Sequence, residues 1–273
     1  MEIKINNNNA DITIDTEKTI GEIMAGLENW LAGSGHRLSG IAIDGQAANL
    51  SSMEEIFVKD IDSVKLLEIS TSSIAELDAV SLLNLLADID EYENLSFEER
   101  NAFFNNWKER PQALFASEYN DDLYDAFVNT FLNAAFSAQV LRSITEERLR
   151  EVNEPLKEFE NIKQMIEEVC ARLVDLPLDI QTGKDARAAQ TIQIFSALAQ
   201  KIIRIIKQFE IQGFFQKESV SVLITGFNEK VKEFLNAYEA QDTVLIGDLA
   251  EYEIAPGLQE LYKNCHEAMA GIK

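Results

Sequence analysis

Short runs in which apolar and polar residues alternate occur only before residue 73 of this chain, where they flank one run of helical spacing. After residue 73 apolar residues recur every three or four positions. The first pattern is typical of strands with one buried face, and the second is typical of amphipathic helices. Only four prolines and twelve glycines occur in 273 residues, so the later runs can be long helices. The sequence therefore predicts a mainly α chain with a small α+β domain in front.

The first seventy residues predict a mixed unit of short strands and one main helix. Four asparagines at 6–9 separate two alternating runs, and asparagine tolerates the positive φ that hairpin turns require. Thr19 and Glu22 have the spacing of a capping box, which predicts a helix start. Asp44 and Gly45 form a turn dipeptide. The expected elements, in order, are strands at 2–6 and 11–15, a helix at 19–32, a strand at 38–43, a helical turn at 51–55 and a strand at 64–69.

This order of hairpin, helix, strand, turn and strand resembles the β-grasp, or ubiquitin-like, fold. The resemblance rests on that order, on Ile41–Gly45 as strand and turn, and on Val64–Ile69 as the closing strand. It implies a domain at 1–72. Members of the fold serve as covalent modifiers, sulfur carriers or docking modules, and the first two roles need a free C-terminal Gly-Gly. Here residues 70–73 read Ser-Thr-Ser-Ser and lead into more protein, so the resemblance implies docking. The alternative to a docking module is a small α+β domain that only packs on the helical region as a structural cap.

Residues 73–273 predict a bundle of six to seven helices. Two further capping boxes open helices there, Ser73 with Glu76 and Ser96 with Glu99. Residues 123–144 are apolar on most faces, which favours one central helix. A break is expected at 153–155, an internal linker at 175–185, and a kink at Pro256.

The chain is strongly acidic, with 24 basic and 47 acidic residues and a net charge of −23. Such a surface repels phosphate backbones and anionic lipid headgroups, so we expect neither nucleic acid nor a membrane as a partner. It suits a protein partner that is basic or carries an apolar segment. Cys170 and Cys265 lie in helical patterns and predict buried free thiols in a reducing compartment. No basic or apolar leader and no long apolar span is evident, so we expect a cytoplasmic chain.

No motif for catalysis, a metal or a cofactor stands out in the sequence. His36 and His266 are the only histidines. Cys265 precedes His266, but neighbours on a helix point about 100° apart, which is unsuited to a nucleophile and its base. The acidic run that starts at Asp88 lacks the glycine of a calcium loop. We therefore expect no catalytic residue, no metal and no cofactor, and a protein that is not an enzyme.

Two regions are candidates for contact with a partner. The first is the run Gln181, Thr182, Gly183 and Lys184, and the second is the aromatic group Phe103, Phe104 and Trp107. The first resembles the end of a phosphate loop but lacks the first glycine, the hydroxyl and the strand, so a tight turn with Asp185 as a helix cap is the simpler interpretation. Core packing is the simpler interpretation of the aromatic group.

Three functions are compatible with the sequence. The preferred hypothesis is a non-enzymatic adaptor or regulator that binds other proteins. The second is a chaperone for a secreted or flagellar-type subunit, which would hold an apolar segment in a groove. The third is an enzyme whose site uses carboxylates, lysine and tyrosine alone. That enzyme would need a pocket lined by several of Asp88, Asp90, Tyr92, Glu93, Lys184 and Tyr252.

Overall fold

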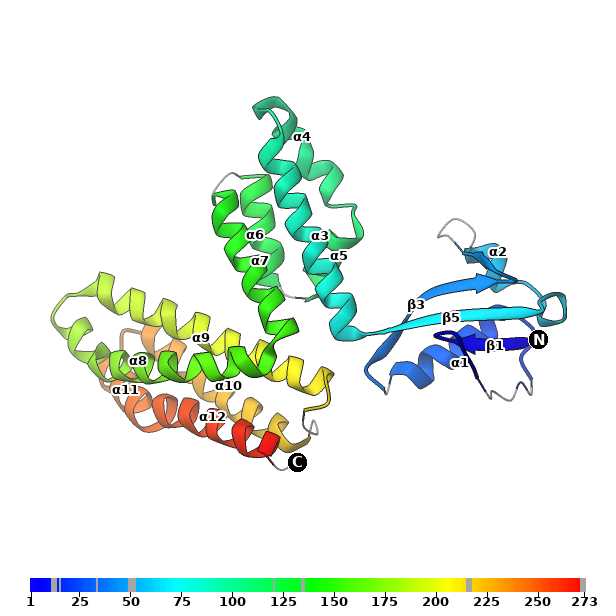
Figure 1. Ribbon diagram of the computed structural model, residues 1–273. Helices are drawn as coiled ribbons and strands as arrows, with labels where there is room; N and C mark the ends of the chain where they lie inside the picture. The colour runs from blue at the N-terminus through cyan, green and yellow to red at the C-terminus, as the bar shows by residue number, and fades with distance from the viewer. Residues whose placement is uncertain are drawn as a thin grey trace. The chain divides into compact units, whose positions relative to one another are not determined.

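A computed structural model describes residues 1–10, 14, 16–32, 34–48, 53–119, 121–133, 136–214 and 218–270 (Figure 1). The chain forms two units, Met1–Ser81 and Leu82–Lys273. The boundary falls inside helix α3 (Ile74–Asn94). No helix in the described ranges has both the length and the apolar character needed to span a bilayer. The chain is thus mainly α with a small α+β domain, as the sequence predicts.

The first unit is built on a mixed sheet that has five strands in the described residues. These are β1 (Glu2–Ile5), β2 (Asn8–Asn9), β3 (His36–Ile43), β4 (Gln46–Ala47) and β5 (Leu66–Ser73). Their order is β2-β1-β5-β3-β4, with β1 and β5 parallel and the other neighbours antiparallel. The connections contain α1 (Ile20–Ala32), α2 (Met53–Phe57) and the short 3₁₀ helix η2 (Ile61–Ser63). This arrangement is compatible with a β-grasp-like fold.

The asparagine run makes a tighter hairpin than the sequence predicts. Asn6 and Asn7 have φ of 49° and 65°, the two positive values of a two-residue turn. The second strand therefore begins at Asn8, inside the asparagine run. The strand expected at 11–15 falls almost wholly outside the described residues.

All three predicted capping boxes form. The backbone amide of each glutamate donates to the serine or threonine hydroxyl, and the carboxylate accepts from the cap residue's amide; the pairs are Thr19–Glu22, Ser73–Glu76 and Ser96–Glu99. Hydrogen bonds from Ser73 lower the pKa of Glu76, and those from Ser96 lower the pKa of Glu99. Three helix starts are therefore fixed by local chemistry.

The core of the first unit lies between α1, α2 and the sheet. Apolar side chains from these elements and from the segment before β5 pack together: Ile3, Ile20, Ile23, Met24, Leu27, Ile41, Ile43, Ile56, Val64, Leu67 and Ile69. The isoleucines at 41 and 43 in β3 and the pair Leu67 and Ile69 in β5 are two residues apart, as the strand period requires.

Helices make up the described part of the second unit. After α3 come α4 (Phe97–Trp107), α5 (Pro111–Tyr119), α6 (Asp121–Phe131), α7 (Ala138–Asn153), α8 (Pro155–Gln181), α9 (Asp185–Ile211), α10 (Glu218–Glu239), α11 (Thr243–Leu249), the π-helix η3 (Ala250–Ile254) and α12 (Ala255–Ala270). Counting α3, the described residues contain ten α-helices and one π-helix after the sheet, so the predicted number of six to seven is too low.

The single central helix predicted at 123–144 is two helices. Helix α6 ends at Phe131, and α7 begins after Ser137, whose hydroxyl accepts from the amide of Val140 at 3.3 Å. Leu132 and Phe136, in the connection, are 56% and 46% exposed. The pattern looked apolar all round because an apolar connection joins two amphipathic helices.

The linker predicted at 175–185 is also mostly helix. Helix α8 continues through Pro177 to Gln181 and leaves a short turn at 182–184. A Cβ added to Gly247 of α11 would lie 3.1 Å from Cγ of Pro177, so the proline ring packs closely on α11. This packing holds the helix beyond a residue that would end an isolated one.

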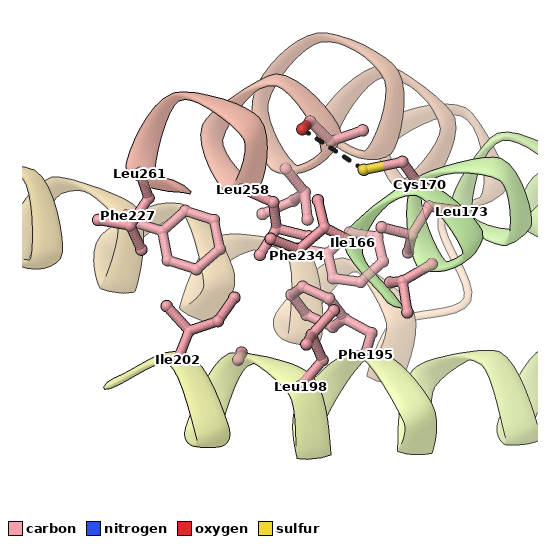
Figure 2. Packing of buried hydrophobic residues seen from close by; sticks show 14 of the residues in the cluster. Ile166, Cys170, Leu173, Phe195, Leu198, Ile202, Phe227, Phe234, Leu258 and Leu261 are labelled. Carbon is pink, nitrogen blue, oxygen red and sulfur yellow. Dashed lines mark hydrogen bonds between the residues drawn. The ribbon is translucent and has the colours of Figure 1, made fainter. Parts of the chain in front are cut away.

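Helices α8 to α12 share one hydrophobic core (Figure 2). Phe195 and Phe234 meet edge to face, with ring centroids 5.6 Å apart. The Cys170 thiol donates a hydrogen bond to the carbonyl of Ala255 at 3.6 Å, which links α8 to the start of α12. The apolar stripes predicted for these helices thus face one another.

We expect neither cysteine thiol to react in the folded protein. Cys170 is 8% exposed and Cys265 is 0% exposed. Burial raises the pKa of both thiols, that of Cys265 to about 12, so little thiolate is present near neutral pH. A thiol-specific reagent should label no cysteine in native protein and both in denaturant. Rapid labelling of the native protein would contradict this burial.

Candidate protein-binding grooves

A groove lies between α10, η3 and α12, with a volume of about 260 Å³. We call it the α10–α12 groove. Its lining residues are Val222, Gly226, Phe227, Lys230, Tyr252, Glu253, Pro256, Gly257, Glu260 and Leu261. Phe227 and Leu261 belong to the buried core (Figure 2), so they form the floor of the groove, whereas Val222 and Tyr252 are 77% and 67% exposed. The groove thus has an apolar floor and two exposed apolar side chains at its rim.

Pro256 and Gly257 shape the α10–α12 groove. Proline has no N–H to donate along the helix, and the five residues before Ala255 form the π-helix. A Cβ on Gly257 would lie 3.0 Å from Cδ2 of Phe227, so glycine lets α12 approach α10 closely. The helix type therefore changes just before Pro256, and such π turns are frequent at functional sites. The kink expected at Pro256 stays a prediction.

Acidic side chains surround the α10–α12 groove. Its one lysine, Lys230, lies 3.6 Å from a carboxylate oxygen of Glu233 and 3.8 Å from one of Glu253. Hydrogen bonding to Glu251, together with the charges of Glu251 and Asp248, raises the pKa of Tyr252. The electrostatic potential at this rim is therefore negative.

A second groove, the α9–α10 groove, has a volume of about 440 Å³. It is lined by Ala189, Ile192, Gln193, Ser196, Ala197, Gln200, Leu235 and Tyr238. Residues 188–200 of α9 carry no charged side chain, although charged residues make up 26% of the chain. Gly226 and Leu235 are nine residues apart on α10, and about 100° per residue places them on opposite faces of that helix. The two grooves therefore flank α10.

A third groove, between α8 and α12, is lined by Lys163, Tyr262, Lys263, His266 and Glu267. His266 stacks on Tyr262 with ring centroids 6.5 Å apart. Cys265, its neighbour in sequence, is fully buried in the core on another face of α12. The expectation that Cys265 and His266 do not converge agrees with this geometry.

The predicted contact run 181–184 forms an exposed turn between α8 and α9. Gly183 has φ of 70°, the left-handed conformation that ends many helices. Lys184 Nζ lies 3.4 Å from Oδ1 of the buried Asp179. Asp185 does not cap α9 as expected, because Lys184 occupies the cap position and makes no side-chain cap bond. The turn is accessible, but its one lysine, Lys184, forms an ion pair with Asp179.

Replacing Gly183 by alanine should destabilise the protein by about 1–2 kcal/mol, because an L-residue is strained at this φ. The matched control is Gly226→Ala in α10, where no atom lies within 4 Å of the added Cβ. That change should stabilise the helix by about 0.5–1 kcal/mol. Urea denaturation followed by circular dichroism measures both. Equal effects of the two substitutions would contradict the left-handed cap.

The predicted aromatic contact residues are mostly core. Phe103 is 4% exposed and Trp107 is 0% exposed. Trp107 stacks on Phe127 at 5.2 Å and meets Phe131 edge to face at 5.3 Å. Phe104 is half-buried beside Trp107. Phe103 and Trp107 therefore offer no surface to a partner, which corrects their choice as contact residues.

The six residues that an enzyme site would use belong to three separate elements. Asp88, Asp90, Tyr92 and Glu93 are on α3, Lys184 is in the α8–α9 turn, and Tyr252 is in η3. Arg142 pairs with Asp90 and Glu93 at 2.6 and 2.7 Å, and the Tyr92 hydroxyl donates to the carbonyl of Thr130 at 3.3 Å. In the described ranges, no group of three or more His, Cys, Asp or Glu residues is placed to hold a metal.

Two segments of the chain match family models. Residues 1–73 match the model described as the TP0873 N-terminal domain, and residues 157–264 match a domain of unknown function, DUF8042. The first match ends where β5 ends, and every residue that lines the α9–α10 and α10–α12 grooves falls within the second. Comparison with curated proteins found no match, and comparison with solved structures found none.

Of the residues that line the two grooves, the sequence patterns had singled out Tyr252, for an enzyme site, and Pro256, for a kink. A signal was available in Gly226 and in the pair Pro256 and Gly257, because such residues inside helical patterns mark breaks or close approaches. Those residues indicate that a helix is broken, or is approached closely by another helix, at these positions. They do not show which other helix comes close.

Proposed function

We propose that the chain is a non-enzymatic cytoplasmic adaptor that binds a partner protein through its C-terminal helices. The observation that carries this proposal is the pair of grooves that α10 helps to line. The α10–α12 groove, with about 260 Å³, is smaller than typical small-molecule sites of ~300–1,000 Å³, and the α9–α10 groove, with about 440 Å³, falls in the lower part of that range. Grooves of this size with exposed apolar rims suit the side chains of another protein.

The polar residues support the same proposal. The carboxylates of Asp88, Asp90 and Glu93 are held by arginines. The remaining two residues considered for an enzyme lie elsewhere in the second unit. A reaction would need reactive groups that line one cavity, and these six residues do not line a common cavity.

We also propose that residues 1–73 are a β-grasp domain with a docking role. Its support is the strand order β2-β1-β5-β3-β4 around a parallel β1–β5 pair. The strand β5 continues into α3 without an intervening residue, so no free chain end follows the sheet for a modifier or carrier role.

A chaperone for an exported subunit is the second candidate. The α9–α10 groove favours it, because a long uncharged stretch of α9 beside Leu235 and Tyr238 could hold an apolar segment of a client. An adaptor and a chaperone differ in the partner: the chaperone's client would be unfolded or partly helical when bound, whereas the adaptor's partner would keep its own fold.

Site-specific photocrosslinking tests the adaptor proposal. A photoreactive amino acid is placed at Ser196 in the α9–α10 groove, at Tyr252 in the α10–α12 groove, and at Lys184 in the exposed turn. Glu167, exposed on α8 outside the grooves, is the control position. Irradiation in the native host should link one defined protein to a groove position and not to the control. That protein, once identified, should bind the full chain when both are purified.

Uniform labelling at all positions would mean non-specific contact and would contradict the proposal. So would a complex with the purified candidate that survives charged substitutions in both grooves. Hydrogen exchange of the bound partner separates the two candidates, because a chaperone's client should exchange quickly outside the bound segment.

A further inference from the structure

We propose that the α10–α12 groove binds a cationic protein segment that inserts one apolar anchor side chain. This inference rests on the proposed function and specifies its ligand. The occupant is a segment of a partner protein that carries a leucine-like or aromatic residue flanked by lysine or arginine. Three observations lead to it: the size of the groove, the charge of its rim and the exposure of two of its side chains.

The size of the groove fits an anchor side chain. A cavity of about 150 Å³ lined by apolar residues takes up a benzene ring. The α10–α12 groove has about 260 Å³ over a floor of Phe227 and Leu261, which is room for one large side chain and part of a neighbour. Gly226 and Gly257 add no side chains to its walls, so the anchor would pack against backbone and the Phe227 ring.

The charge of the rim selects a cationic segment. Glu253 and Glu260 line the groove, and Glu251 and Asp248 act on Tyr252 beside it. Lys230 is offset by Glu233 and Glu253, and no ion pair to Glu260 is present among the described residues. A second copy of this chain, with its own charge of −23, would meet a like-charged surface. A lysine- or arginine-rich segment would instead be attracted and oriented.

The exposed side chains complete the groove. Val222 on α10 and Tyr252 on η3 are both more than two-thirds exposed at its rim, 77% and 67%. Tyrosine is enriched among residues that dominate binding energy, since its ring buries a large area and its hydroxyl keeps a polar partner. A bound segment would cover both side chains, and its cations would meet Glu251, Glu253 and Glu260.

Fluorescence anisotropy with the full chain tests this inference. The probe is a labelled helical peptide of leucine and lysine, with leucines at i, i+3, i+4 and i+7, and the matched probe replaces every lysine by glutamate. The lysine probe should bind and the glutamate probe should not. Tyr252→Ala and Glu260→Lys should each weaken binding of the lysine probe by about tenfold. Val222→Asn, also at an exposed site, removes apolar surface without adding a charge and should weaken binding as well.

Two control variants separate the groove from general attraction. Val244→Ala removes a 70% exposed side chain from α11, outside the groove, and should leave binding within about twofold. Glu167→Lys, at an exposed position on α8, makes the same charge change as Glu260→Lys. It should weaken binding of the lysine probe much less. Circular dichroism confirms that each variant is folded.

Equal losses from Glu167→Lys and Glu260→Lys would overturn the inference, because binding would then follow net charge alone. Full binding by Tyr252→Ala and Val222→Asn, or binding of the glutamate probe, would also overturn it. Failure here is distinguishable from failure of the proposed function. A partner crosslinked at Ser196 and not at Tyr252 would keep the adaptor proposal and reject this ligand.

Discussion

Replacing Glu151 by glutamine should lower the free energy of unfolding by about 3–5 kcal/mol. The Glu151 side chain on α7 is fully buried and accepts from Nε and Nη2 of Arg204 on α9 at 2.8 and 2.9 Å. Nη1 of Arg148 lies 3.4 Å away. Without the carboxylate, two largely buried guanidinium groups lose a counter-charge in surroundings that solvate them poorly. Urea denaturation followed by circular dichroism measures the change.

The control for this prediction is Glu167→Gln, which removes the same charge from an exposed position on α8 and should change stability by less than about 0.5 kcal/mol. A double variant, Glu151→Met with Arg204→Met, should recover much of the lost stability, because it removes both charges of the main pair. A loss below about 1 kcal/mol for Glu151→Gln would show that water reaches this site.

Removal of the Asp88 carboxylate should cost a similar amount, about 3–5 kcal/mol. Asp88 on α3 is 3% exposed. Its carboxylate accepts from Nε1 of Trp107 at 2.9 Å, from Nη1 of Arg110 at 2.6 Å and from Nε2 of Gln112 at 3.0 Å. Asp88→Ala would leave these donors without their shared acceptor, at the point where α4 and α5 pack on α3. Thermal unfolding and the near-ultraviolet signal of the tryptophans report the loss.

Asp90→Ala is the matched control, since it makes the same substitution two residues away on the same helix. Its side chain is 64% exposed and pairs with Arg142, so the expected cost is below about 1 kcal/mol. If Asp90→Ala proved as harmful as Asp88→Ala, burial would not be the reason for the Asp88 effect.

Local signals predicted much of the fold correctly. The capping boxes placed three helix starts, and the change in period separated sheet from helices. The errors arose where packing overrides local preference. Pro177 stays helical because it packs against Gly247. The connection between α6 and α7 resembles a buried helix in sequence because two of its exposed residues, Leu132 and Phe136, are apolar.

The candidate site was harder to predict for a related reason. Each wall of the α10–α12 groove is an ordinary helical stripe when read alone. The groove exists because Gly257 and Phe227, thirty residues apart, come into close contact. A single sequence shows which positions are unusual and does not show which of them meet. The contact residues chosen from composition were therefore aromatic ones, and those fill the core.

The π-helix before Pro256 determines which face of α12 is turned toward α10. A π turn holds one residue more than an α turn, and one residue corresponds to about 100° of rotation. If the five residues Ala250–Ile254 were shortened by one, α12 would present a different stripe to α10, and Gly257 and Leu261 would turn away from Phe227. The register of the last helix, and the shape of the surface it completes, thus depend on a single inserted position.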